Sequence, residues 1–395
     1  MIRAESGLEA SVCIVGMGAQ TPVGRTAPSA AAAVRARVSQ IAEHPYLVDL
    51  RCTPMVVARA PWIEDNLDCA RRMLALGKPA LREALAPLAL HPLRSQHRLL
   101  VLLGLPAPRP GLSEDRCSWL AQHLRDALPP SEGAVTVEVV TAGHALALSS
   151  LKLACQELAA QRVDACLVGG VDSFLCAETL NWLESEGRLF TAHNPRGAVP
   201  GEAAAFLLLM TSDRCHQIGL RALAGVVSAA TAEEPAPLGS RSVCTGEGLS
   251  HAFRTALAKL PLGVRVDHAL CDLNGEPYRA DELAFTLART SEWFVRPGAF
   301  RTPVDCWGDV GAASGGLLIM LAVSAWQRGY APGSLILVSA SSGAHPLRAA
   351  ALLQAPPPSG SILHDFNHQR ERPVPLSHGQ RRDCHRDSPR CVQDA

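Results

Sequence analysis

Two long apolar stretches dominate the hydrophobic pattern of the chain, and the first begins at Thr141. It predicts a tight Gly-His turn, an apolar helix that carries only Lys152 and Glu157, and then a strand over 165–168. A helix with so few charged positions is expected to be buried on most sides. Because two glycines let the backbone turn where a side chain would clash, Gly169-Gly170 is expected to end the strand. A buried helix that opens on a turn of small residues favours a site for a reactive group or an anion.

The second apolar stretch, residues 308–340, repeats the order of the first. In both, a glycine-polar pair (Gly143-His144 and Gly308-Asp309) precedes small residues, an apolar helix, a Gln-Arg pair and an apolar strand. Two copies of such a unit indicate a duplicated α/β protein whose two buried helices meet at the centre.

The rest of the pattern predicts further strands and helices around these two units. The expected strands are 11–15, 98–104, 135–140, 202–210, 220–230 and 266–271, and the expected helices are 27–39, 68–86, 119–128, 177–186, 248–259 and 280–290. Pro79 is expected to interrupt the second helix. Residues 16–22 begin like a dinucleotide-binding fingerprint, but Thr21 stands at its third glycine, so we predict a plain glycine-rich turn.

Composition excludes several classes of protein. The 395 residues include 37 basic and 37 acidic ones, a balance that does not favour nucleic acid or an anionic membrane surface as a partner. The 13 cysteines form no C-x-x-C pair, which argues against a zinc module or a disulfide scaffold and for a reducing compartment. The first residues lack the apolar core of a signal peptide, and residues 310–327 are too polar for a membrane span. We therefore expect a soluble, cytoplasmic protein.

Residues 355–395 differ in composition from the rest of the chain. Pro, His, Arg, Asp and Ser dominate there without apolar periodicity, which predicts a disordered tail. Its His378, Cys384, His385 and Cys391 have a spacing that fits no standard metal site, so we predict no metal ligands in it.

Six short motifs follow one another along the chain: SVCIVGMGAQTPVG (11–24), the first apolar unit (143–173), a loop and strand containing PGEAA (187–210), DLNGEPYRADE (272–282), GDVGAASG (308–315) and Ser341-Ser342-Gly343. In this order they resemble the motifs of β-ketoacyl-(acyl-carrier-protein) synthases, in the thiolase superfamily. The resemblance extends from Ser11 to about Leu353. The chain is similar to the family in the order of its motifs more than in any single one.

The resemblance implies a thiolase-like αβαβα layered sandwich made of two duplicated halves, residues 1–215 and 216–354, with two buried central helices. The first half would be similar to the N-terminal β-ketoacyl synthase domain. The family condenses an acyl thioester with a malonyl unit on a carrier protein and needs no cofactor. A cysteine at the turn of the first buried helix takes the acyl group, and two histidines with a nearby lysine stabilise the enolate and oxyanion.

Carried over to this sequence, the family's catalytic positions are replaced. Counting back from Gly169-Gly170 places His144 at the nucleophile position, and the two histidine positions fall on Asp272 and Asp309. The lysine position falls near Val304. An imidazole forms no stable thioester and two carboxylates repel a developing enolate, so these replacements do not favour ordinary condensation. The resemblance places substrate contacts at Gly143, Phe190, Gly275, Gly308 and Gly343.

Other groups near these positions leave alternatives open. Cys155 is expected to be a core thiol, whereas Cys271 and Cys306 border the later site loops and are better substitutes for the missing nucleophile. If His144, Asp272 and Asp309 converge, they would hold a divalent metal or form an acid–base pair. The simpler interpretation is a degenerate pocket whose polar side chains bond to one another, and we assign no metal ligand.

The resemblance also implies partners. Family members form dimers through an edge strand of the first half, for which Ala165–Val168 or its neighbours would serve here. The implied ligands are an acyl-carrier protein or acyl-CoA, and the implied protein partner is a second copy or a related synthase. Because carrier proteins are acidic, a basic patch of Arg188, Arg196 and Arg279 would support docking, although each also fits an ordinary solvated loop.

Three functions remain open at this point. The first is a β-ketoacyl synthase-like acyltransferase of fatty-acid or polyketide type with a remodelled site. The second is a non-catalytic partner or scaffold subunit that retains an acyl pocket. The third is different chemistry on acyl thioesters, such as decarboxylation or hydrolysis, from a His-Asp-Asp cluster.

Overall fold

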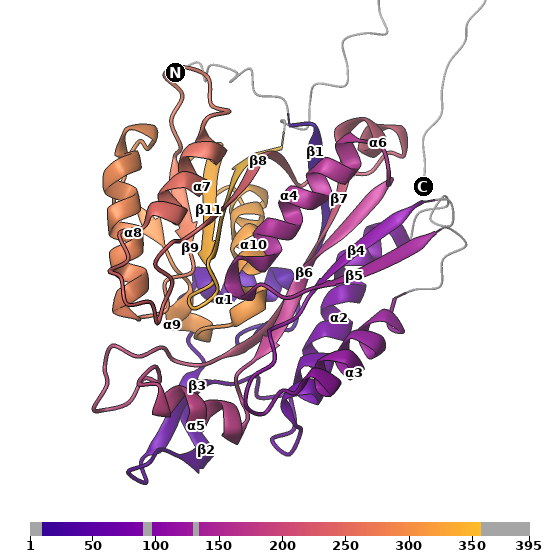
Figure 1. The fold of residues 1–395 in the computed structure, drawn as a ribbon. Helices are drawn as coiled ribbons and strands as arrows, with labels where there is room; N and C mark the ends of the chain where they lie inside the picture. Colours follow the sequence, from indigo (N-terminus) through magenta and orange to yellow (C-terminus); the bar gives the residue numbers. More distant parts are fainter. Residues whose placement is uncertain (1–9, 90–96, 129–133, 357–395) are drawn as a thin grey trace, which may run out of the picture. The chain divides into compact units, whose positions relative to one another are not determined.

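The computed structural model describes residues 10–89, 97–128 and 134–356 (Figure 1). The predicted tail, with its histidines and cysteines, lies outside the described residues except for its first two. In the described part of the chain, no helix combines the length and the apolar character needed to cross a bilayer.

The first half builds a five-stranded sheet in the order β5-β4-β6-β7-β1. Its elements are β1 (Val12–Gln20), α1 (Ala27–Arg35), β2 (Ile41–Val48), β3 (Pro54–Ala58), α2 (Cys69–Ala89), β4 (Leu99–Gly104), α3 (Glu114–Arg125), β5 (Val135–Val140), the 3₁₀ turn η2 (Gly143–Ala145), α4 (Leu146–Ala159), β6 (Ala165–Ser173), α5 (Ala177–Ser185), β7 (Glu202–Thr211) and α6 (Ser212–Gln217). Strands β2 and β3 pair as a separate hairpin.

The second half repeats this arrangement in the order β10-β9-β11-β12-β8. Its elements are β8 (Ala224–Glu233), α7 (Glu247–Leu257), β9 (His268–Cys271), α8 (Pro277–Thr290), η3 (Ser291–Trp293), β10 (Phe300–Arg301), α9 (Val304–Trp307), the 3₁₀ turn η4 (Gly311–Ala313), α10 (Ser314–Gln327), β11 (Leu335–Ser341) and β12 (Leu347–Gln354). In each half the first three strands run parallel and the last two antiparallel. The identical order and directions confirm the predicted duplication.

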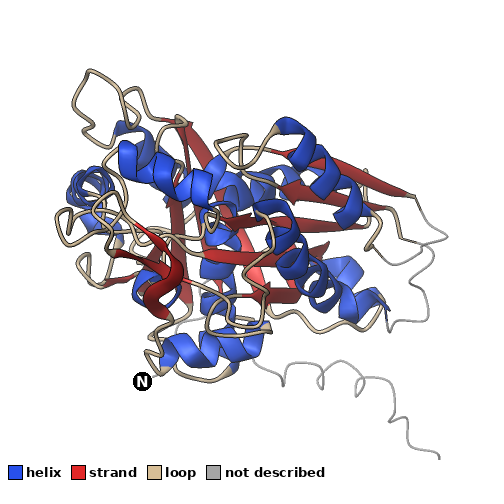
Figure 2. Ribbon diagram, turned by 90° about the horizontal axis from the view of Figure 1, so that it is seen from below, coloured by secondary structure: helices blue, strands red, loops and turns tan. Residues whose placement is uncertain are grey.

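The two sheets meet at one short seam and enclose the two central helices. Strand β1 pairs with β8 only over Val12–Ile14, which joins the halves into one ten-stranded sheet. Helix α4 contacts β6 of its own half and β8 of the other, while α10 contacts β11 and β7. Helix α2 packs on the outer face of the first sheet with α3 beside it, and α7 packs on that of the second with α8 beside it (Figure 1). Figure 2 shows the helices and strands of these layers from below. These layers are the predicted αβαβα sandwich.

The apolar core follows these layers. One buried cluster joins α4 and α10 to strands of both halves. A second lies between the first sheet and α2 with α3, and a third between the second sheet and α7 with α8. Burial of continuous apolar runs explains why β4, β6 and β11 show no alternation of polar and apolar residues.

Strand β1 and helix α2 differ from the prediction. Strand β1 continues to Gln20, through the residues expected to form a glycine-rich turn. A Cβ at Gly16 would lie 2.3 Å from the Ala84 carbonyl oxygen, and one at Gly18 would lie 2.1 Å from that of Ala80. The two glycines therefore let the backbone of α2 lie directly on the strand. Packed in this way, α2 continues through Pro79, where an interruption was predicted.

Strand β6 also departs from expectation. It continues through Gly169-Gly170 to Ser173, because β7 pairs with it along this whole length. It lies between β4 and β7, so Ala165–Val168 is not an edge strand and its prediction as a dimer contact is wrong. The free edge of the first half is β5. The hairpin β2–β3 was not predicted at all.

Candidate functional site

His144 lies in the first turn before the central helix α4. Gly143 opens the turn η2 with a φ of 64°, and the Ala145 amide donates to the Ser342 hydroxyl at 3.0 Å. The same hydroxyl donates to the carbonyl of Ala142. The loop after β11 in the second half thus fixes the position of a first-half turn.

Asp309 belongs to the second half, and a loop of the first half fixes its position. Its amide donates to the Val199 carbonyl at 2.7 Å, and the Gly201 amide donates to its carbonyl at 2.8 Å. These bonds tie the residues before η4 to the loop that precedes β7. The two loops bring position 309 to the side of position 144.

A short hydrogen bond joins the two side chains. His144 Nε2 donates to Asp309 Oδ1 at 2.6 Å, with both residues buried. The Gly311 amide donates to the same oxygen at 3.0 Å, and Asn274 Nδ2 donates to Oδ2 at 2.7 Å. Burial alone would raise the pKa of Asp309, but His144, Arg279 and Asn274 outweigh it and hold that pKa well below its usual range. Asp309 is therefore a fully satisfied carboxylate.

The hydrogen bonds continue from this pair toward the surface. Asn274 Nδ2 also donates to Glu276 Oε2 at 2.9 Å, and Arg188 Nε donates to Glu276 Oε1 at 2.7 Å. Burial raises the pKa of Glu276, yet Arg188 and Arg279 lower it below its ordinary value overall. Hydrogen bonds thus join the side chains of His144, Asp309, Asn274, Glu276 and Arg188 in one continuous network.

Asp272 joins the same cluster through Arg279. Its Oδ2 accepts from Arg279 Nη1 at 2.7 Å and from the Ser341 amide at 3.0 Å. Arg279 is 2% exposed, and its pKa is raised because Asp272, Asp309 and Glu276 outweigh the effect of burial. Arg279 therefore offers no surface charge, and its predicted place in a basic docking patch is wrong. Arg188 is largely buried in its ion pair with Glu276, and Arg196 is exposed.

The cluster combines buried acidic and basic groups. It contains three carboxylates (Asp272, Glu276 and Asp309) and two guanidinium groups (Arg188 and Arg279). His144 is the remaining basic group. It donates to Asp309, which also accepts hydrogen bonds from Gly311 and Asn274. Removing one member would leave an uncompensated buried charge, which is the costly way to break such a network.

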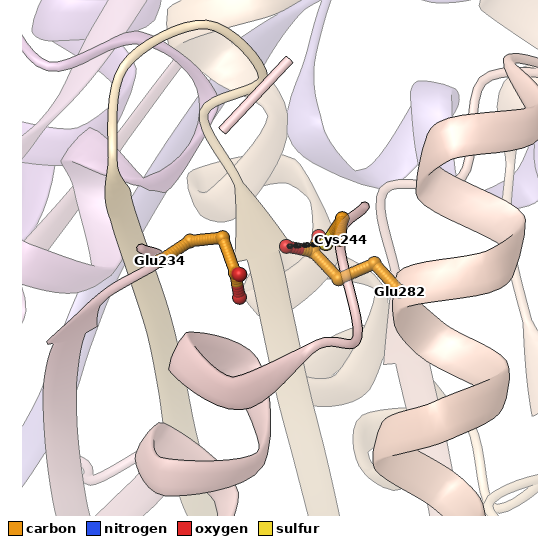
Figure 3. A group of neighbouring side chains, drawn as sticks. All are labelled: Glu234, Cys244 and Glu282. Atoms are coloured by element: carbon orange, nitrogen blue, oxygen red, sulfur yellow. Dashed lines mark hydrogen bonds between the residues drawn. The ribbon is translucent and has the colours of Figure 1, made fainter. Parts of the chain in front are cut away.

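These contacts bear on the metal hypothesis. The guanidinium of Arg279 already takes the place of a cation beside Asp272. Among the described residues, the group of three whose metal-ligand atoms all lie within 4.8 Å of one another is Glu234, Cys244 and Glu282 instead (Figure 3). The three predicted residues meet as an ion-pair network and not as a ligand set.

The Glu234, Cys244 and Glu282 cluster is also charge-compensated. Arg348 Nε donates to Glu282 Oε1 at 2.5 Å, and the Gly248 amide at the start of α7 donates to Glu234 Oε2 at 2.8 Å. A guanidinium and a helix N-terminus supply the positive charge that a metal would bring. We interpret this cluster as part of the structural core of the second half.

A small cavity lies beside Asp309. It measures about 20 Å³, which is room for about one water molecule. Asp272, Asn274, Trp307 and Leu318 contribute to its lining, and so does Val304, near which the resemblance places the family's lysine. The cavity has no space for an acyl chain in this conformation.

None of the substitute cysteines has an activated thiol. Burial raises the pKa of Cys155 and of Cys271 to about 12, and it raises the pKa of Cys306 as well. A thiol that stays protonated is a poor nucleophile. The site has no cysteine ready to replace the one expected at position 144.

The predicted substrate contacts are spread along the loops around the cluster. Gly308 lines the cavity, Gly143 adjoins Ser342, and Gly343 is near Arg279. Gly275 lies against the Gly197 carbonyl, and the Phe190 amide donates to Ala198. Their part in binding substrate remains a prediction. Sequence reasoning missed Asn274 and Glu276, although both stand in the polar loop DLNGE, which follows a buried strand.

Comparisons with known proteins point to one class. Residues 134–214 match the model of the β-ketoacyl synthase N-terminal domain. A comparison with curated proteins gives no significant match. Solved ketosynthase structures, in contrast, superpose on most of the chain. The chain thus has a thiolase-like fold of the ketosynthase type.

Three of these structures illustrate the likeness. A chain of a type II polyketide synthase complex between an acyl-carrier protein and its ketosynthase (AntDE:AntF) is 14% identical, with a TM-score of 0.68, covering 88% of this chain and 99% of that one. The ishigamide ketosynthase/chain length factor is 17% identical, with a TM-score of 0.69 and coverages of 88% and 99%. An oxazolomycin ketosynthase domain from Streptomyces albus JA3453 is 16% identical, with a TM-score of 0.68 and coverages of 87% and 75%.

Proposed function

We propose that this protein is a non-condensing subunit of a fatty-acid or polyketide type acyl-processing system. It would work beside an active ketosynthase and an acyl-carrier protein. The observation that carries the proposal is the bond between His144 and Asp309, at the two positions where condensation needs a cysteine and a histidine. A ketosynthase/chain length factor among the similar structures is a precedent for such a paired assembly.

The chemistry of the cluster supports this proposal. The imidazole of His144 is committed to Asp309, whose remaining oxygen is committed to Asn274. Asp272 faces Arg279, so neither carboxylate donates a hydrogen bond to a developing enolate. The halves, residues 1–215 and 216–354, would keep the ketosynthase architecture while the ion-pair network replaces its reactive groups. We further propose a reducing, cytoplasmic setting, because the described cysteines are free thiols.

Strand β5 is the surface that we propose for dimer formation, with a second copy or a related ketosynthase. Among the strands that the structure describes, it pairs only with β4, and Val135 and Val139 are 37% and 44% exposed. An apolar edge strand presents unpaired backbone groups to another chain. β5 also leads directly into the turn of His144, so a partner at this edge would lie near the cluster.

The first test is acylation. The full-length protein is incubated with acyl- and malonyl-loaded carrier protein, and its intact mass is measured. We expect no stable acyl adduct on the wild type. The variant His144→Cys places a thiol at the first turn of α4, and we expect this variant to acquire an adduct at position 144.

The matched control for acylation is His251→Cys, which puts a cysteine on an exposed position of α7. It should stay unmodified under the same conditions. An adduct on the wild type would overturn the proposal. A folded His144→Cys protein that is not acylated would contradict the placement of residue 144 at the nucleophile position. Release of carbon dioxide from the malonyl thioester without transfer would instead support acid–base chemistry by His144 and Asp309.

The second test concerns the dimer. Light scattering of the protein, alone and with a candidate ketosynthase partner, should detect a dimer. Val139→Lys should weaken it by placing charges at the edge. Val295→Lys, at a position of the second half that is 54% exposed, is the control and should not. Equal dimerisation of both variants would exclude β5 as the contact.

A further inference from the structure

Two cysteines outside the candidate site lie together between α2 and α5. Cys69 is the first residue of α2 and is fully buried, and Cys176 is the N-cap of α5 and is half-buried. Cys69 Sγ donates to the Ser173 carbonyl at 2.9 Å, and Cys176 Sγ lies 3.0 Å from the Thr179 hydroxyl. The two thiols also lie near enough for each to shift the pKa of the other. The segment that follows β6 thus brings Cys176 close to the thiol at the start of α2.

A buried arginine completes this group. Arg109 Nη2 donates at 2.7 Å to the carbonyl of Ser173, the same oxygen that accepts from Cys69, and at 2.6 Å to Asp172 Oδ1. Its guanidinium stacks 4.3 Å from the Phe174 ring centre. A fixed positive charge next to a thiol stabilises the thiolate, as does the N-terminus of a helix.

The two thiols have different acidities. The neighbouring Cys69 and the Thr179 hydroxyl lower the pKa of Cys176 although burial opposes them. The neighbouring Cys176 together with burial raises the pKa of Cys69. Cys176 is also the half-buried thiol at the N-terminus of α5, whereas Cys69 is buried and donates its S–H to the Ser173 carbonyl. Position and acidity thus make Cys176 the nucleophilic sulfur and Cys69 the proton-bearing neighbour that can resolve an oxidised Cys176.

We propose that Cys69 and Cys176 form a reversible disulfide when the protein meets a peroxide. The Cys176 thiolate attacks one oxygen of hydrogen peroxide, an S–O bond forms, the O–O bond breaks, and hydroxide leaves. Cys176 is then a sulfenic acid. The Cys69 sulfur attacks the Cys176 sulfur, the S–O bond breaks, and the hydroxyl leaves as water with the Cys69 proton. A dithiol reductant reverses the reaction and is itself oxidised to a disulfide.

The thiol pair is linked to the candidate site through Asp172. The second oxygen of Asp172 accepts from the Ala312 amide in η4 at 3.1 Å, and the neighbouring Gly311 amide donates to Asp309. Formation of the disulfide would remove the Cys69 S–H group that donates to the Ser173 carbonyl, and it would alter the surroundings of Arg109, which donates to the same oxygen. The proposed disulfide is thus connected to the His144–Asp309 pair by hydrogen bonds on either side of the Gly311–Ala312 peptide. It does not depend on the function proposed above.

The test maps disulfides in the full-length wild-type protein after treatment with hydrogen peroxide. The protein is quenched, alkylated and digested, and its peptides are identified by mass spectrometry. We expect a peptide pair joined at Cys69 and Cys176 that dithiothreitol separates. We also expect the urea midpoint of the oxidised protein to rise, because the bond restricts the unfolded chain. Recovery of both cysteines as free thiols, or pairing of either with another cysteine, would overturn the proposal.

Variants assign the two roles. Cys69→Ser should leave a sulfenic acid at Cys176 that dimedone traps, and Cys176→Ser should abolish both the adduct and the disulfide. Cys117→Ser is the matched control, since Cys117 is a third half-buried thiol whose pKa Arg109 also affects. It should retain the disulfide. In the untreated wild type, Cys176 should alkylate at least about 10-fold faster than Cys117 at neutral pH. Equal rates would contradict the assignment of Cys176 as the attacking thiol.

Discussion

The turns that precede the two central helices have the same backbone conformation but different side chains. Each is a 3₁₀ turn that begins at a glycine with positive φ, Gly143 at 64° and Gly311 at 49°, and each precedes an α-helix of 14 residues. The middle residue is His144 in the first and Ala312 in the second. The two halves therefore have the same turn geometry and differ in the side chain at the middle of the turn.

Each turn is also held by the opposite half. Ala145 donates its amide to Ser342, which follows β11, and Ala312 donates its amide to Asp172, which belongs to β6. Strands β6 and β11 are equivalent in the two sheets. A hydroxyl supports one turn and a carboxylate paired with Arg109 supports the other. The comparison teaches that the halves are interlocked by reciprocal contacts, although the supporting groups are chemically different.

The first test of this comparison adds a side chain at each of the two glycine positions. A Cβ at Gly311 would lie 1.9 Å from Asp172 Oδ2, whereas a Cβ at Gly143 would meet Ser342 Cβ at 3.2 Å. Each substitution adds backbone strain to the steric overlap. We therefore expect Gly311→Ala to lower the free energy of unfolding by about 4 kcal/mol and Gly143→Ala to lower it by about 2 kcal/mol. Urea unfolding of both variants measures the difference. Equal losses would show that the two turns are equally tolerant.

Removing the charge of Asp309 is the second test. Asn in its place would direct an amide N–H₂ group either at the donors His144 and Gly311 or at the donor Asn274. We expect Asp309→Asn to lower the free energy of unfolding by about 3 kcal/mol. Asp164→Asn removes a surface ion pair with Arg98 and should cost less than about 1 kcal/mol. A small effect at both sites would mean that the buried network does not stabilise the fold.

The third test compares the two central helices themselves. Nearly all of α10 is buried, whereas α4 has one face that is only partly covered. We expect Leu317→Ala in α10 to cost about 3 kcal/mol and the partly buried Leu153→Ala in α4 about 1 kcal/mol. Chemical denaturation checks this ranking, and a reversed order would contradict it.

The smallest predicted effect is on the pH dependence of stability. Because folding lowers the pKa of Asp309, its ionised form stabilises the protein above the ordinary carboxyl pKa. This contribution is lost as the pH falls below about 4, with a slope of up to about 1.4 kcal/mol per pH unit from this one group. Asp309→Asn should flatten the acid side of the curve, while Glu276 keeps part of it in both proteins. Parallel curves would exclude Asp309 as the source.

Much of the fold was predictable because apolar runs determine it. The two buried units, the duplication and most of the strands follow from uncharged stretches between polar turns. The internal match was three residues out of register, since Gly143 corresponds to Gly311 and not to Gly308. The sequence alone does not distinguish two glycines so close together. Both have a positive φ in the structure, and only Gly311 begins a 3₁₀ turn before a central helix.

The candidate site was predictable in its members but not in its bonding. His144, Asp272 and Asp309 do meet in one cluster, as the motifs indicated. Arg279 had been placed on the surface because an arginine in a polar loop is usually solvated. Its burial depends on three carboxylates, Asp272 and Glu276 in its own segment and Asp309 in a distant one. Such pairing leaves no periodic pattern in the sequence. Asn274 and Glu276 were missed for the same reason.

The short seam between β1 and β8 has a consequence for how the chain is made. Strand β1 leaves the ribosome well before its strand partners, which are β7, ending at Thr211, and β8, which follows. At ordinary rates of translation these partners arrive roughly 10 to 40 s later. During that time an apolar strand has both edges open, which favours pairing with other nascent chains. The position of one strand therefore makes biosynthesis, rather than the finished fold, the stage at which this protein is most exposed to aggregation.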